Sequence, residues 1–246
     1  MPNGFSQHVR MRQDQFEDYV ELVAKTREEW SGRVDVRLGL EADYFEGSEA
    51  FLEKQMASAD FHFVLGSVHP QIAEFRTRYW QPEEFEVQQT YFKLLAQSAE
   101  TGLFDSLAHP DLIKNVTTKV WSPNAIMDDI RHALDRIAAT GVAMELNTSG
   151  VNKTISEMNP FPAMLKEMCQ RNIPVTLGAD AHGPDRVADG YETALQLLLE
   201  CGFSHVSFFL ERKRHEVLIQ DALASLVGNS QALTKTTEVG KLGVGK

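Results

Sequence analysis

Short apolar runs alternate with amphipathic stretches along most of the chain. The apolar runs have the length of buried strands and predict six of them, at residues 33–41, 61–69, 104–112, 141–149, 173–181 and 205–210. The amphipathic stretches carry apolar residues at helical spacing and predict helices at residues 13–30, 83–102, 122–141 and 190–202. Because strands and helices alternate, we expect parallel βα units in an α/β fold.

Capping residues mark the ends of the predicted helices. Ser122 is a suitable N-cap, and Pro123 occupies the first helical position, where its missing N–H is tolerated. Gly141 follows the last periodic residue of the same helix. Periodicity is lost from about Asn229 onward. The sequence therefore predicts one domain over residues 1–228 and a flexible tail over residues 229–246.

Length and charge narrow the classes of function. The 246 residues can bury one sizeable core, and single α/β barrels of this length are common. The formal net charge of -11 argues against a nucleic-acid partner. Two cysteines are too few for a disulfide framework. Without an apolar run of membrane length or a signal-peptide core, the chain is expected to have no membrane partner and to be cytoplasmic.

Ligand-type side chains follow four of the predicted strands. They are Glu41, His69, His109, Asp180 and His182. The carboxyl ends of parallel strands form the site face of α/β folds, so these side chains should meet there. A buried polar cluster without compensation would be costly, which favours a bound ion. Imidazole and carboxylate without thiolate suit Zn²⁺, Mn²⁺ or Fe²⁺ at a hydrolytic centre.

Several segments, in order, resemble the PHP (polymerase and histidinol phosphatase) family, and most closely its histidinol-phosphatase branch. The segments are "GFSQH", "LGLEADYFEG", "VLGSVH", "LAHPDLIK", "MELNTSG", "LGADAH", "GYETALQLLLECGF" and "FFLERK". They cover about residues 4 to 215, and their combination is more specific than any one of them. The resemblance implies a distorted (β/α)₇ barrel, similar to a TIM barrel, with two or three divalent metal ions.

The resemblance also implies a role for each ligand-type residue. Glu41 resembles the glutamate that bridges two metals, and His69 and His109 resemble the histidines that complete one of those sites. Asp180 resembles a ligand of a second metal, and His182 a ligand of a third position together with His8.

Two further residues match positions that the family places near the substrate. Asn147, in "ELNTSG", resembles a residue that lines the pocket without binding metal. Arg212, in "FFLERK", matches an arginine after the last strand and is a candidate phosphate contact, because a guanidinium binds phosphate through two hydrogen bonds.

One family motif is missing from the sequence. The family opens with a strand that ends in a His-x-His motif, and the chain contains no such motif. The first strand of the barrel is therefore expected to be missing as well. Two explanations are open: the natural protein carries an upstream strand with these ligands, or the ligands have been lost.

The activity implied by the resemblance is hydrolysis of L-histidinol phosphate, a step of histidine biosynthesis. Asp180 would orient or deprotonate the attacking water, and His182 or His109 would protonate the leaving group. One alternative is a PHP phosphoesterase acting on another small phosphate ester or a nucleotide. Another is a catalytically degenerate barrel that binds a metal or a partner. The sequence leaves the oligomeric state open.

Overall fold

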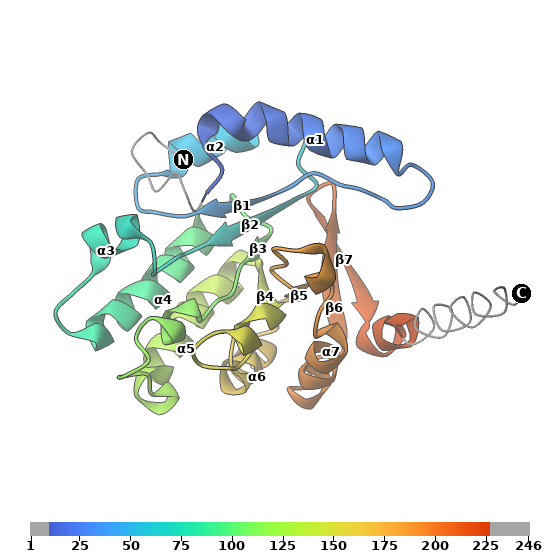
Figure 1. Ribbon diagram of the computed structural model, residues 1–246. Helices are drawn as coiled ribbons and strands as arrows, with labels where there is room; N and C mark the ends of the chain where they lie inside the picture. The colour runs from blue at the N-terminus through green and yellow to red at the C-terminus, as the bar shows by residue number, and fades with distance from the viewer. Residues whose placement is uncertain (1–9, 227–246) are drawn as a thin grey trace, which may run out of the picture.

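One sheet, whose strand order follows the order of the chain, organises the molecule (Figure 1). The computed structural model of the protein describes residues 10–226. In that range the strands are β1 (Gly39–Asp43), β2 (Phe63–Ser67), β3 (Ser106–Leu107), β4 (Ala143–Asn147), β5 (Val175–Gly178), β6 (His205–Leu210) and β7 (Lys213–Leu218). Neighbours from β1 to β6 pair in parallel, and β7 pairs with β6 antiparallel. The predicted parallel α/β architecture is confirmed.

One helix precedes the first strand, and the others connect the successive parallel strands. The helices are α1 (Phe16–Glu29), α2 (Glu49–Met56), α3 (Ala73–Tyr79), α4 (Glu84–Glu100), α5 (Pro123–Thr140), α6 (Pro162–Gln170) and α7 (Tyr191–Glu200), with the 3₁₀ turns η1 (Gln13–Gln15), η2 (Leu112–Asn115), η3 (Thr148–Asn152) and η4 (Pro184–Arg186). In Figure 1, α1 and α2 lie above β1, and α4 to α7 lie below the strands. None of the helices within residues 10–226 is long and apolar enough to cross a membrane.

The boundaries of α5 show how the local sequence sets an element. The helix begins at Pro123, directly after Ser122, and ends at Gly141, which adopts a left-handed φ of 75°. Its buried residues are Ile126, Ile130, Ala133, Leu134 and Ile137, which recur every three or four positions. These boundaries match the prediction, although the Ser122 side chain makes no capping hydrogen bond.

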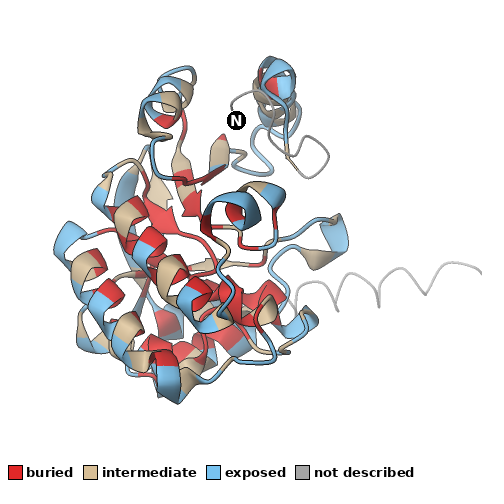
Figure 2. Ribbon diagram, turned by 90° about the vertical axis from the view of Figure 1, so that its left-hand side faces the viewer, coloured by how far each residue is buried: buried red, intermediate tan, exposed pale blue. Residues whose placement is uncertain are grey.

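Buried apolar residues gather on the strands and on the inner faces of the helices (Figure 2). All five residues of β4 are buried, so β4 runs through the centre of the core. At Gly66 in β2, an added Cβ would lie 2.5 Å from the ring of Phe104, so glycine is required for this packing. The core thus supports β2, β3 and β4 directly beneath their carboxyl ends.

Three helices and one strand were not expected from the sequence: α2, α3, α6 and β7. Five of the six predicted strands are longer than those observed, whereas the strand predicted at residues 205–210 coincides with β6. The first, expected over residues 33–41, begins only at Gly39 and continues to Asp43, so Glu41 lies inside β1 and not at its end. Within residues 10–226 no strand precedes β1. The predicted tail at residues 229–246 lies outside the described residues.

Candidate metal centre

Three of the predicted ligands come together: Glu41 from within β1, and His69 and His109 from just beyond β2 and β3. The ligand atoms of Glu41, His69 and His109 all lie within 4.8 Å of one another. The Glu41 Oε1 atom is 3.2 Å from Nε2 of His109 and 3.5 Å from Nε2 of His69. His69 and His109 each stand two residues beyond the end of their strand. The predicted convergence of these three residues is confirmed.

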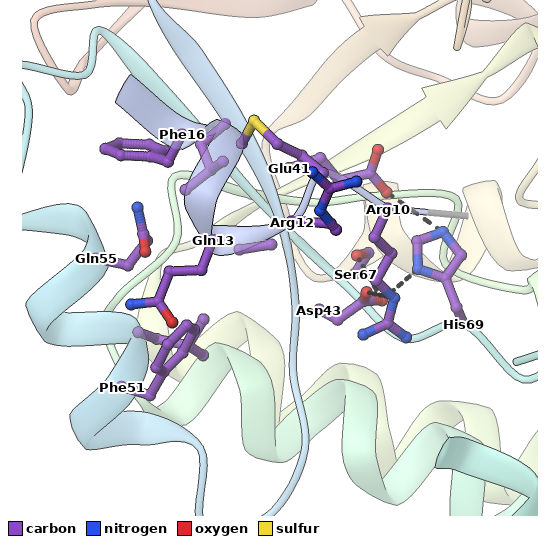
Figure 3. Close-up of a pocket in the computed structure, with 14 residues that line it drawn as sticks. Arg10, Arg12, Gln13, Phe16, Glu41, Asp43, Phe51, Gln55, Ser67 and His69 are labelled. Atoms are coloured by element: carbon purple, nitrogen blue, oxygen red, sulfur yellow. Dashed lines mark hydrogen bonds and ion pairs between the residues drawn. The ribbon is translucent and has the colours of Figure 1, made fainter. Parts of the chain in front are cut away.

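Asp43 orients His69. The Nδ1 atom of His69 hydrogen-bonds to Oδ1 of Asp43, which is buried. The other oxygen of Asp43 forms an ion pair of 3.0 Å with Arg10, and Ser67 donates to Oδ1 (Figure 3). Because a carboxylate only accepts hydrogen bonds, Nδ1 carries the proton, and in the neutral ring Nε2 keeps its lone pair toward Glu41.

A carboxylate of β4 fixes the backbone at His109. His109 has a left-handed φ of 30°, a conformation that side chains other than glycine adopt rarely. Its backbone N–H donates to Oε2 of Glu145 over 2.8 Å, and Glu145 itself is buried. The His109 ring is 3% exposed, so its orientation is fixed by packing as well.

Glu41 and His109 each stabilise the charged form of the other. Desolvation opposes the charge of Glu41, but the hydrogen bond and charge of His109 outweigh it and lower the pKa of Glu41 to about 2. Burial likewise opposes the charged form of His109, but the hydrogen bond and charge of Glu41 raise its pKa above 6.5. Burial raises the pKa of Glu145. Because the Glu41 side chain is 37% exposed, solvent weakens these interactions relative to a fully buried pair.

The donor set fits a divalent metal ion. The Nε2 atoms of His69 and His109 both face Oε1 of Glu41, so three ligand atoms point toward one place. One carboxylate and two imidazoles in reach of one point are ligands that Zn²⁺, Mn²⁺ and Fe²⁺ accept. The cluster could therefore hold such an ion, with Asp43 as the outer partner of one imidazole.

Asp180 and His182 are not part of this cluster and line a separate pocket with Ser149 and Lys153. Asp180, at φ 48°, accepts from Ser149 Oγ over 3.0 Å and pairs with Lys153 at 3.7 Å. The His182 side chain is 87% exposed, and its Nδ1 lies 2.9 Å from the carbonyl oxygen of Asp180. The charge of Lys153 opposes the raised pKa of His109, so Lys153, which pairs with Asp180, is also near enough to act on His109.

The other predicted site residues differ in their placement. Asn147 is buried, donates to Glu145 and accepts from the backbone N–H of Ser149, so its amide is held by neighbouring residues. Arg212 forms an ion pair of 2.6 Å with Asp105, directly before β3, whereas His109 follows β3. The structure thus does not bring Arg212 to the cluster. His8 lies outside the described residues.

Two residues of the site were missed by sequence reasoning: Asp43 and Glu145. Asp43 lies two residues after Glu41 on β1, and Glu145 two residues before Asn147 on β4. Because side chains alternate across a strand, residues two apart share a face. Searching for a second polar residue at that spacing would have found both.

Fold and site together define a protein of the PHP class, and the comparisons agree. The PHP domain model matches residues 3–149, so the chain belongs to the PHP family. A protein from Deinococcus radiodurans named "Probable histidinol-phosphatase" is 34% identical over 85% of this chain and 81% of its own length. The histidinol-phosphatase of Bacillus subtilis is 25% identical over 76% of this chain and 78% of its own.

A solved structure has the same fold. The histidinol phosphate phosphatase of Lactococcus lactis, solved with zinc, L-histidinol and phosphate, aligns with a TM-score of 0.67 and 20% identity over 81% of this chain and 79% of its own. The predicted family and fold class are confirmed.

Proposed function

We propose that this chain is a metal-dependent phosphatase that hydrolyses L-histidinol phosphate to L-histidinol and phosphate. The observation that carries the proposal is the convergence of Glu41, His69 and His109 in a chain of the PHP family. The names of the relatives and the ligands bound by the Lactococcus lactis protein support this substrate. Bound cations would also offset the formal net charge of -11, which by itself disfavours a phosphorylated substrate.

Six residues are proposed as metal ligands for two or three ions of Zn, Mn or Fe: His8, Glu41, His69, His109, Asp180 and His182. Ions of this kind lower the pKa of water and neutralise charge on phosphate oxygens. Glu41, His69 and His109 have the geometry to hold one ion together. For the ion or ions at Asp180 and His182, the proposal rests on the resemblance to the family and on the chemistry of the two side chains.

Asp180 and His182 are also proposed to move protons. The Asp180 carboxylate would orient the attacking water and accept its proton at one oxygen. As the water oxygen bonds to phosphorus, the bond to the histidinol oxygen breaks, and the leaving alkoxide takes a proton from the His182 ring. The high exposure of His182 is compatible with exchange of that proton with solvent.

The test is phosphate release from L-histidinol phosphate by the full chain supplied with Mn²⁺ or Zn²⁺. We expect turnover in the wild type, and a fall to the uncatalysed background in Glu41→Gln and His109→Ala. His132→Ala removes an exposed histidine of α5 and serves as the matched control, with activity unchanged.

Other outcomes would select the alternatives. Hydrolysis of glycerol phosphate or a nucleotide in preference to L-histidinol phosphate would show a PHP phosphoesterase of different specificity. A folded chain that binds metal and releases phosphate from none of these esters would indicate a degenerate barrel.

A further inference from the structure

β4 contributes none of the six proposed ligands, yet its polar side chains, together with Ser149 just beyond it, link the two ligand groups. Glu145 and Asn147 lie on one face of β4, and Ser149 follows in η3. All three are buried. Polar groups buried in the centre of a core are costly unless each has a hydrogen-bond partner, so the partners of these three residues indicate what they do.

The line of hydrogen-bonded polar residues formed by Glu145, Asn147 and Ser149 begins at His109. Oε2 of Glu145 accepts from the backbone N–H of His109 at 2.8 Å and from Nδ2 of Asn147 at 3.0 Å. The other oxygen, Oε1, fills the space that a side chain at Gly178 would need. Glu145 is thereby confined from two sides, and it holds His109 in its left-handed conformation.

The second end is at Asp180. Oδ1 of Asn147 accepts from the backbone N–H of Ser149 at 3.0 Å, and the Ser149 hydroxyl lies 2.6 Å from the same oxygen. That hydroxyl also lies 3.0 Å from Oδ2 of Asp180. Asp180, like His109, has a left-handed backbone, with φ 48°. A continuous line of hydrogen-bonding groups therefore joins two strained residues from different strands.

We propose that Glu145, Asn147 and Ser149 are positioning residues that hold His109 and Asp180 at a fixed separation, so that the two groups serve one metal centre. The proposal rests on the proposed function, because it concerns the same ligands. Left-handed backbone at residues other than glycine persists only where its surroundings determine it, and here Glu145 of β4 contacts His109 while Ser149 of η3 contacts Asp180. A stabilising role alone would not require both ends of the line to terminate on proposed ligands.

The experiment is a titration of the metal-depleted full chain with Mn²⁺, alongside its free energy of unfolding. We expect Ser149→Ala and Glu145→Ala to weaken Mn²⁺ binding about tenfold, the usual effect of losing an outer partner of a ligand. Glu145→Gln keeps an oxygen that can accept from His109 and should retain most of the affinity. Asn147→Asp keeps the acceptor for Ser149 but faces Glu145 with a like charge, so it should weaken binding as Glu145→Ala does.

Thr176→Val is the matched control. It removes a buried hydroxyl that pairs with Ser106 at 2.9 Å, and within residues 10–226 no hydrogen bond joins that hydroxyl to a proposed ligand. It should lower stability without changing Mn²⁺ affinity. If Ser149→Ala and Glu145→Ala also lose only stability, the residues are structural and the proposal is overturned. Should Glu145→Ala fail to fold, the milder Ser149→Ala decides alone.

The titration separates this proposal from the proposed function. A wild type that binds Mn²⁺ but releases no phosphate from L-histidinol phosphate would refute the proposed function, while the variants would still test positioning through their affinities. A wild type that binds no metal would overturn both.

Discussion

Asp43 and His69 form a carboxylate–imidazole pair that lies between Glu41 and Arg10. The ring presents Nε2 to Glu41 at 3.5 Å, and the carboxylate pairs with Arg10 at 3.0 Å. The pair fixes both the proton position and the plane of the imidazole. In the candidate metal centre, His69 is therefore already held in the tautomer that a metal ligand needs.

Replacing Asp43 with Asn should weaken metal binding about tenfold, since the outer partners of ligating histidines typically contribute that much. An asparagine amide can donate to Nδ1 and so favour the tautomer with its proton on Nε2. Calorimetric titration with Zn²⁺ measures the effect. Asp35→Asn removes an exposed carboxylate that pairs with Arg37 and should leave the affinity unchanged. Equal affinities of the Asp43 and Asp35 variants would contradict the assigned role.

Metal uptake should depend on pH through His109. Because its pKa is raised above 6.5, the metal-depleted chain retains a proton on His109 that the metal must displace. Affinity should therefore increase as the pH rises through this pKa and then level off. Glu41, with a pKa of about 2, stays ionised throughout and adds no dependence in this range.

The same shift predicts how the stability of the metal-depleted chain varies with pH. A raised folded-state pKa contributes stability below the unfolded value of 6.5, and this contribution is lost as the pH rises through the folded value. Glu41→Gln should lower the pKa of His109, which NMR titration of the ring can follow. An unchanged His109 titration in this variant would show that Glu41 is not its main partner.

Lys114 should be a strong determinant of stability. It is fully buried, pairs with the equally buried Asp111 at 2.9 Å, and donates to the Met158 carbonyl at 2.7 Å. Lys114→Met should cost about 3–5 kcal/mol in urea unfolding, because it leaves the Asp111 charge buried without its cation. Lys93→Met, which removes an exposed lysine 3.7 Å from Glu46, should cost less than about 1 kcal/mol. Combining Lys114→Met with Asp111→Asn should recover part of the loss.

Arg212 should affect stability more than substrate binding. Its guanidinium pairs with Asp105 at 2.6 Å and donates to the Leu103 carbonyl at 2.7 Å. Burial raises the pKa of Asp105, which the Arg212 pair opposes. Arg212→Ala should lower the free energy of unfolding by about 1–3 kcal/mol, because it leaves the buried Asp105 carboxylate without its partner. The KM for L-histidinol phosphate should stay unchanged. Arg214→Ala, on the same hairpin, is the control. A raised KM with unchanged stability would instead support the phosphate contact.

The periodic elements could be predicted because their residues carry the signal locally. Pro123, Gly141 and the buried face between them were sufficient to define α5. The β6–β7 hairpin was not predictable in this way, since its turn residues Glu211 and Arg212 adopt left-handed φ values of 51° and 62° without glycine or asparagine. Short α3 buries only Phe75 and Tyr79, too few residues for a clear period.

The proposed metal ligands were easier to predict than Glu145 and Asp43, the residues that hold them in place. His69, His109 and Asp180 each stand two residues past a strand, a position that the strand itself marks. Glu145 has no such mark, because its role depends on the left-handed backbone of His109 and on space opened by a residue of another strand. Such relations arise only when the chain folds. Asp43 could be predicted in part: the sequence shows that it lies two residues after Glu41, but not that it bonds to His69.

Because Gly178 has no side chain, the Glu145 carboxylate can occupy the space beside it, so the residues at positions 178 and 145 constrain each other. Any larger residue at position 178 would collide with the Glu145 carboxylate, so it could persist only alongside a shorter residue at position 145. Among related proteins, these two positions should therefore vary together. A larger residue at position 178 combined with a smaller one at position 145 would still fill the core. It would, however, remove the carboxylate that accepts from the backbone N–H of His109.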